Sequence, residues 1–177
     1  MSEFQLYIGQ ADQFISDSKE ARRIVEALLT ETKEWSNLIS DVDSTVREIL
    51  QDIKKYVNGE MYPGEPSNAA IIYREPGAGG ASRGLNSGDY LTNFQDLHHQ
   101  GGKTLIGSPI WVEWNDRVNA INVREGFFIA VYEHANFGGD KLIVLGPARL
   151  HNLPGINWGD KISSAMVYPV NEIKRAW

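Results

Sequence analysis

The chain has 177 residues, of which 42% are hydrophobic, no cysteine and a formal net charge of −6. This length allows one well-buried core or a small domain with an added element, and the absence of cysteine excludes disulfides, thiolate metal sites and cysteine nucleophiles. The acidic balance argues against sequence-independent binding of nucleic acid, which needs a dense cationic surface, and is compatible with binding cations.

The first residues, MSEFQLYIGQADQF, contain no basic segment and no long apolar run. Nowhere in the chain do about 18 apolar residues stand together, as a membrane-spanning helix would require. We therefore expect a soluble, cytoplasmic protein that does not associate with membranes.

Residues 1–60 are predicted to be helical. Apolar residues recur every seven positions from Phe14 to Tyr56, with a second row four residues after each, which is typical of an amphipathic helix over residues 11–57. Asn58 and Gly59 are suited to end it after Val57. One unbroken helix would be roughly 70 Å long. Two forms remain open: a helical hairpin that breaks near residues 33–37, and an extended helix that forms a homo-oligomer or binds a protein partner.

A second region with a different composition begins near residue 60. Only Gly9 among the 17 glycines precedes Gly59, and all seven prolines lie at or after Pro63. Short apolar runs such as AAIIY, FFIAVYE and KLIVL alternate with turns, which predicts strands. No segment between them could form a crossover helix, so we expect antiparallel sheets. The predicted fold class is α+β, with a helical region at 1–60 and a β-sandwich at 61–177.

The strand region contains an internal repeat. Tyr73 and Tyr132 are each followed 18 residues later by a related segment, LTNF and LHNL. Further on, WNDRVNAINV at residues 114–123 matches WGDKISSAMV at residues 158–167. Such shared spacing indicates a duplicated structural unit. The first unit carries an insertion at residues 95–109, which is long enough to be a candidate contact loop for a protein partner.

The second unit begins with a hairpin signature. Tyr132, Phe137 and Gly139 stand in the order aromatic, four residues, aromatic, one residue, glycine. With the spacing and the WxDxxSS segment, this resembles the βγ-crystallin family. The first unit has Ala78 in place of the second aromatic residue. The resemblance implies two Greek keys, at about residues 69–124 and 125–170, in a sandwich of about eight strands.

The resemblance also implies Ca²⁺ as a bound ion. In that family a motif of Asn/Asp-Asn/Asp-x-x-Ser/Thr-Ser occurs in each Greek key, and each ion is shared between the keys. Calcium binds six to eight oxygens from carboxylates, amides, hydroxyls and carbonyls. Carried over by position, site one comprises Asn115, Asp116, the Arg117 carbonyl and Ser163; site two comprises Asp160, the Lys161 carbonyl and Asn119. Each site is expected to gain a carbonyl from a hairpin, near Glu75 and Glu133.

Two departures from the motif affect the expected ligands. Gly159 removes an oxygen-bearing side chain from site two, and Asn119 replaces a hydroxyl. We therefore expect site one to bind better than site two, while the positive charges of Arg117 and Lys161 weaken both. The alternative is that these Asp, Asn and Ser side chains only stabilise turns.

No nucleophile elbow, phosphate loop or catalytic triad order is present, so we expect no enzyme. The first hypothesis is a non-enzymatic calcium-binding protein whose helical region serves packing or oligomerisation. One alternative is a protein-binding module or inhibitor that uses the 95–109 insertion. Another is a toxin or effector whose helix binds a membrane or a partner.

Overall fold

A computed structural model describes residues 3–29, 44–57 and 68–176 of the chain. The N-terminal part contains β1 (Phe4–Ile8), β2 (Gln13–Ile15), α1 (Ser18–Leu29) and α3 (Ser44–Val57). The repeat region contains β3 (Ala70–Glu75), β4 (Gly79–Leu85), β5 (Tyr90–Leu91), β6 (His98–Lys103), β7 (Pro109–Glu113), β8 (Ala120–Val123), β9 (Phe127–His134), β10 (Gly138–Leu145), β11 (Ala148–Leu150) and β12 (Ser164–Pro169). A 3₁₀ segment, η6 (Val170–Ala176), follows β12.

The strands form two main sheets, and each sheet contains strands from both units. Sheet A has the order β2-β1-β10-β9-β12-β5 and sheet B the order β11-β8-β3-β4. The short strand β5 of the first unit pairs with β12 of the second, and β11 of the second unit pairs with β8 of the first. The two units therefore interlock. Apart from β1 and β2, the two sheets contain eight strands, and this arrangement confirms the predicted Greek-key sandwich.

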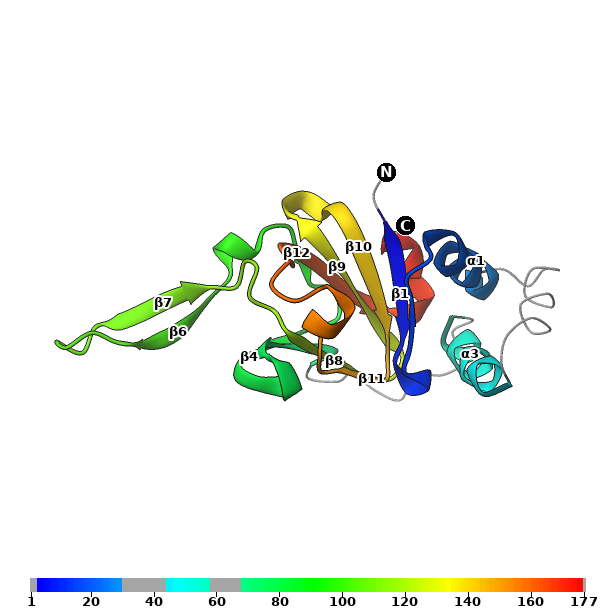
Figure 1. Ribbon diagram of the computed structural model, residues 1–177, viewed down its shortest axis with the longest axis horizontal. Coiled ribbons are helices and arrows are strands. Elements are labelled where there is room, and N and C mark those ends of the chain that lie inside the picture. Colours follow the sequence, from blue (N-terminus) through cyan, green and yellow to red (C-terminus); the bar gives the residue numbers. More distant parts are fainter. Residues whose placement is uncertain (1–2, 30–43, 58–67, 177) are drawn as a thin grey trace.

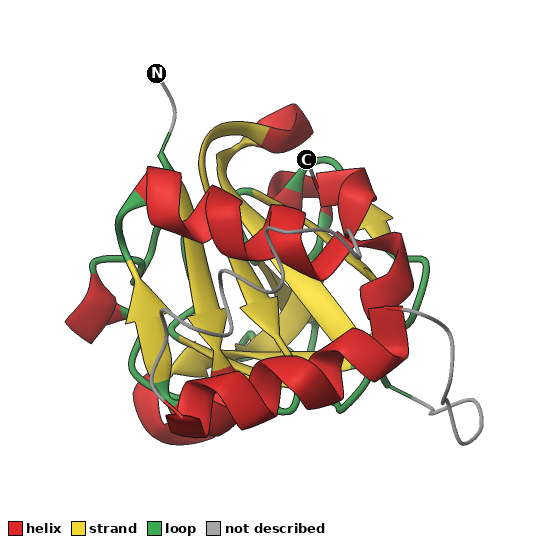
Figure 2. Cartoon of the chain, turned by 90° about the vertical axis from the view of Figure 1, so that its right-hand side faces the viewer, coloured by secondary structure: helices red, strands yellow, loops and turns green. Residues whose placement is uncertain are grey.

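Two hydrophobic cores lie on opposite faces of sheet A. One fills the space between the sheets, and the other lies between sheet A, the two helices and η6. Figure 2 shows the helices across the face of the strands. Strand β9 is buried at six successive positions, 127–132, whereas β3 alternates between buried and half-buried. The continuous apolar run FFIAVY thus reflects a strand that is covered on both faces.

The prediction of helix throughout residues 1–60 is wrong for residues 4–8 and 13–15, which form strands. Residues 4–8 form β1, which pairs in parallel with β10, and residues 13–15 form β2, which is antiparallel to β1. The expectation of purely antiparallel sheets is wrong at this one pair. Phe4, Leu6 and Ile8 are fully buried in the core under the helices, so β1 is stabilised by burial as well as by its ladder. The boundary near residue 60 lies outside the described residues.

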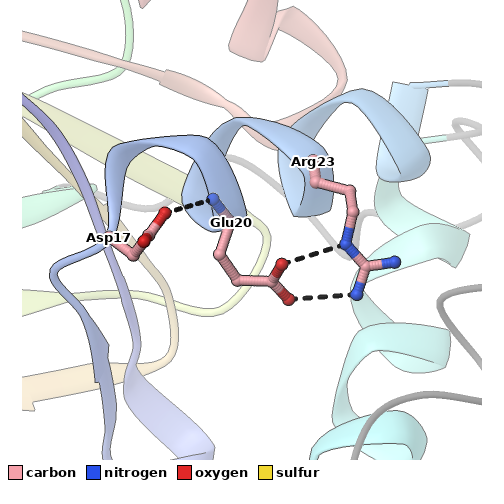
Figure 3. A network of polar contacts seen from close by, with 3 residues as sticks. All are labelled: Asp17, Glu20 and Arg23. Carbon is pink, nitrogen blue, oxygen red and sulfur yellow. Dashed lines mark hydrogen bonds and ion pairs between the residues drawn. The ribbon is translucent and has the colours of Figure 1, made fainter.

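Helix α1 begins at Ser18 because Asp17 caps it. The Asp17 carboxylate accepts the backbone N–H of Glu20 at 2.8 Å (Figure 3), as an N-cap side chain does. The Glu20 carboxylate in turn accepts two hydrogen bonds from the Arg23 guanidinium, each 3.0 Å long. An acidic residue in the first turn also complements the helix dipole.

The described helices contact each other, as the hairpin alternative requires. The Lys54 ammonium, on α3, donates to the backbone carbonyl of Leu28 at the end of α1, at 2.7 Å. A single straight helix would hold these residues roughly 39 Å apart, so the extended form is wrong. Helix α3 is described as far as Val57, so its predicted end and the predicted break at residues 33–37 both depend on residues outside the described ranges.

The insertion of the first unit is an ordered hairpin. Strands β6 and β7 pair with each other as a separate two-stranded sheet, and Figure 1 shows this hairpin projecting from the body on the side opposite to the helices. Its base is held by the hydrogen bond from the Trp114 N–H to the Leu97 carbonyl, at 2.8 Å. Trp114 is fully buried. The predicted contact loop at residues 95–109 is therefore mostly part of a β-ribbon.

Candidate metal site in the repeated turns

The hairpins that open the two units have the same backbone conformation. In the second unit Asn136 and Phe137 have φ values of 57° and 60°. In the first unit Gly77 and Ala78 have φ values of 73° and 61°. The missing aromatic side chain at Ala78 has therefore not changed the fold of the hairpin. Each hairpin is tied to the other unit at its tip: the Gly77 N–H donates to the His151 carbonyl and the Asn136 N–H to the Thr92 carbonyl, both at 2.7 Å.

Phe137 completes an aromatic cluster that the first unit lacks. Its ring lies 5.2 Å from the Tyr132 ring, edge to face, and 4.4 Å from the Tyr90 ring. The Ser164 hydroxyl donates to the His134 carbonyl at 2.6 Å and accepts the Phe137 N–H at 3.1 Å. Ser164 thus closes the hairpin and serves structure, as the turn alternative expects for this residue.

The two repeated turns approach each other through matching backbone bonds. Asp116 and Asp160 both adopt the left-handed conformation, with φ values of 52° and 54°. The Asp116 N–H donates to the Ile162 carbonyl at 3.0 Å, and the Asp160 N–H donates to the Val118 carbonyl at 3.4 Å. Each carboxylate is therefore placed beside the fifth motif position of the other unit.

Site one brings together three of its predicted side chains. The Ser163 hydroxyl donates to Asp116 Oδ1 at 3.1 Å, and the Asn115 amide donates to Asp116 Oδ2 at 2.8 Å. Asp116 is exposed, while Ser163 is only 8% exposed. A carboxylate of the first unit and a hydroxyl of the second thus meet near the surface, and both are oxygen ligands of the type that calcium binds. The Asn115 amide presents its nitrogen to the carboxylate.

Site two brings its predicted side chains together in another way. The Asn119 amide nitrogen donates to Asp160 Oδ1 and to the Arg74 carbonyl, both at 2.8 Å. The hairpin carbonyl that Asn119 contacts is that of Arg74, one residue before Glu75. The amide of Asn119 presents hydrogens, rather than its oxygen, to the two acceptors.

The other predicted ligands have no interaction that assigns them to a site. Arg117 and Glu75 are exposed. Glu133 and Lys161 border a polar hollow of about 40 Å³ together with Glu3, Gln5, Asp140, Ile156, Asn157 and Trp158. In residues 3–29, 44–57 and 68–176, no group of three or more His, Asp or Glu side chains is placed to hold a metal. A calcium ion here would depend on one carboxylate with neutral oxygens.

The chain is similar to known proteins in its structure, but its sequence alone finds no match. No family model and no curated protein matches the sequence. A βγ-crystallin domain from Flavobacterium johnsoniae is 25% identical, with 58% of this chain and 96% of that chain covered and a TM-score of 0.43. One from Clostridium beijerinckii is 26% identical, with 57% and 98% covered and a TM-score of 0.41. A structure headed "Evolution of the eye lens beta-gamma-crystallin domain fold" is 18% identical, with 62% and 94% covered and a TM-score of 0.47.

The topology of the chain itself identifies the fold. Two Greek keys exchange their short strands β5 and β11, and both keys open with the same folded hairpin. Both close with the same left-handed turn at Asp116 and Asp160. Residues 69–169 therefore have a βγ-crystallin-like fold, to which β1, β2 and the helices are added.

Proposed function

We propose that the chain is a non-enzymatic calcium-binding protein whose ion is held at site one. The observation that carries this proposal is the 3.1 Å contact between Asp116 of the first unit and Ser163 of the second. An ion that takes the place of this hydrogen bond, with the Ser163 hydroxyl hydrogen turned away, would be bound by oxygens of both Greek keys. The net charge of −6 favours cation binding over the whole molecule.

Calcium at this place would clamp the two units. The two units are already joined at this place, because the Phe94 N–H, just before the insertion of the first unit, donates to the Ser163 carbonyl at 2.8 Å. An ion that binds only the folded chain raises the free energy of unfolding by about 2.7 kcal/mol at a hundredfold excess over its Kd. We therefore expect calcium to act as a stabiliser of the sandwich.

Thermal melting of protein stripped with a chelator, followed by melting in millimolar calcium, tests the proposal. We expect a rise in Tm of about 5 to 10 °C, from a gain of about 2.7 kcal/mol in a domain of this size. Magnesium is the matched control, because its demand for octahedral geometry at short distances suits this mixed set of oxygens poorly. Equal Tm values in chelator and in calcium would contradict it.

The helices are assigned to packing within the chain. The buried residues of α1 are apolar and lie in the core against sheet A. Its apolar stripe is therefore already covered, and assembly is not needed to explain it. No helix in the described part of the chain is long and apolar enough to cross a bilayer.

A second candidate function is protein binding through the β6–β7 hairpin. Leu105 and Ile106 at its tip are fully exposed, and Trp111 is 62% exposed. The turn is closed internally: the Thr104 N–H donates to the Ser108 carbonyl at 2.8 Å, and the Gly107 N–H to the Thr104 carbonyl at 2.9 Å. A preformed apolar tip loses little entropy on entering a concave pocket of a partner protein. The acidic net charge argues against an anionic membrane as the occupant.

The double variant Leu105→Ser with Ile106→Ser tests this candidate. Both side chains are exposed, so the Tm should stay within about 1 °C of wild type, while binding to an immobilised partner should weaken at least about tenfold. A matched control is Ser87→Ala, on an exposed turn between β4 and β5. Partner binding that survives the double substitution would reject the hairpin as the contact surface.

A further inference from the structure

Two of the positions at which the copies of the turn differ lie against each other in site two. Where site one has Asn115 and Ser163, site two has Gly159 and Asn119. A Cβ atom at Gly159 would lie 2.8 Å from Asn119 Oδ1 and 2.6 Å from Pro154 Cγ. Glycine at 159 leaves the space that the longer Asn119 side chain fills, so the two departures from the repeat form one feature.

The Asn119 amide lies between two oxygens that a calcium ion would need. It is 8% exposed, and its nitrogen donates at 2.8 Å both to Asp160 Oδ1 and to the Arg74 carbonyl. A primary amide has two N–H donors, and both are used. The first acceptor belongs to the second unit and the second to the hairpin of the first unit.

We propose that the Asn119 amide takes the place of the ion in site two and ties the two Greek keys together without metal. This inference rests on the proposed function in one respect: it takes calcium as the ion that the amide excludes. Of the two sites formed where the repeated turns face each other, one is then held by calcium and the other by a permanent internal clamp. The chain binds one calcium ion, not two.

The orientation of the amide explains why calcium does not displace it readily. Turning it over would bring Asn119 Oδ1 against Asp160 Oδ1 and the Arg74 carbonyl, three acceptors with no hydrogen between them. In the observed orientation both acceptors are satisfied, and of the three oxygens only Asn119 Oδ1 is buried without a hydrogen-bond partner. Because each buried acceptor left without a donor is costly, the reversed orientation is less favourable. An ion must first break both hydrogen bonds of Asn119, so the effective affinity of site two falls.

Alanine substitutions at the two equivalent positions separate the roles of the sites. Asn119→Ala should lower the Tm in chelator by about 2 to 8 °C, because two buried hydrogen bonds are lost, and should leave calcium binding intact. Ser163→Ala should leave the Tm in chelator within about 2 °C of wild type, because its single hydroxyl bond is longer, and should weaken calcium binding at least about tenfold. Asn86→Ala, an exposed residue, is the control for the substitution itself and should shift the Tm by less than about 1 °C.

Asn119→Ser tests whether the amide is what closes site two. A hydroxyl has a single donor and cannot bridge both acceptors, so the space for an ion opens. In isothermal titration at millimolar calcium, the number of ions per chain should rise from about one to about two. A count that stays unchanged in this variant would overturn the claim that the amide excludes the ion.

The clamp and the calcium proposal fail in different ways. If wild type binds no calcium, the proposed function fails, while the loss of Tm in Asn119→Ala in chelator still tests the clamp. The proposal of a clamp is wrong if Asn119→Ala and wild type have the same Tm in chelator, or if wild type binds about two calcium ions. Site one can hold calcium in either of those cases.

Discussion

Asp116 and Asp160 are equivalent residues of the two repeats, with left-handed backbones and N–H groups that bind the opposite unit, yet their carboxylates have different partners. Asp116 accepts the Ser163 hydroxyl and the Asn115 amide. Asp160 accepts the Asn119 amide, which is also bound to the Arg74 carbonyl. Both carboxylates accept an amide N–H, but only in site two does one amide bridge two oxygens, those of Asp160 and of the Arg74 carbonyl.

Substitution of the two aspartates should separate these arrangements. Asp116→Ala should abolish the rise in Tm that calcium causes, because the only carboxylate of site one is lost. Asp160→Ala should keep that rise, although its Tm in chelator falls by about 2 to 8 °C with the loss of the charged acceptor of Asn119. Melting of both variants in calcium and in chelator measures the difference. Equal calcium responses of the two variants would contradict the assignment.

The N-terminal strand is an integral part of the sandwich. Leu6, in the middle of β1, is fully buried in the core beneath the helices and lies opposite Ile143 in the ladder. Leu6→Ala should lower the free energy of unfolding by about 2 to 5 kcal/mol, as measured by urea denaturation. Gln13→Ala, on the exposed edge strand β2, should change it by less than about 0.5 kcal/mol. A loss at Leu6 as small as at Gln13 would mean that β1 does not stabilise the fold.

The aromatic cluster of the second hairpin should carry more stability than the degenerate hairpin of the first unit. Phe137→Ala removes a ring that contacts both Tyr132 and Tyr90 and should cost about 1 to 3 kcal/mol in the free energy of unfolding. At the equivalent position Ala78→Gly loses no ring. Glycine suits its φ of 61°, so this change should be neutral or slightly stabilising. Urea titration of the two variants side by side would show the asymmetry, and equal losses would refute it.

Alkaline unfolding should report the burial of Tyr132. Burial, and secondly the proximity of Tyr90, raises its pKa to about 12 from 10.0. Between these pH values the unfolded chain loses the phenol proton first, so the free energy of unfolding falls as the pH rises, by up to about 2 kcal/mol. Below pH 10 both states keep the proton and this effect is absent.

Tyr132→Phe isolates that contribution. The hydroxyl makes only a long bond to the Ala176 carbonyl, at 3.4 Å, so the variant should fold normally near neutral pH. Burial raises the pKa of Tyr7 and lowers that of Lys141, but both groups remain in the variant and cancel in the comparison. The variant should therefore lose less stability than wild type between pH 10 and 12. Parallel pH curves for the two proteins would exclude this role.

Much of the repeat region could be predicted because its signals are local. The tyrosine spacing, the glycines of the hairpins and the duplicated turns all specify conformations within short segments, and the structure confirms them as two Greek keys.

The parts that could not be predicted depend on contacts between distant residues. FQLYI at residues 4–8 contains no signal that it pairs in parallel with Lys141–Leu145, far along the chain. The heptad pattern counted Phe14, although this residue lies in β2. The sequence showed Asn119 and Gly159 as two separate departures, and only their proximity shows that one accommodates the other.

Isothermal titration of calcium into chelator-treated wild-type protein tests the central claim most directly. We predict saturable binding of about one ion per chain, lost in Asp116→Ala and retained in Asp160→Ala. The absence of any binding heat at millimolar calcium, with no change in Tm, would contradict it and would leave both turns as purely structural links between the Greek keys.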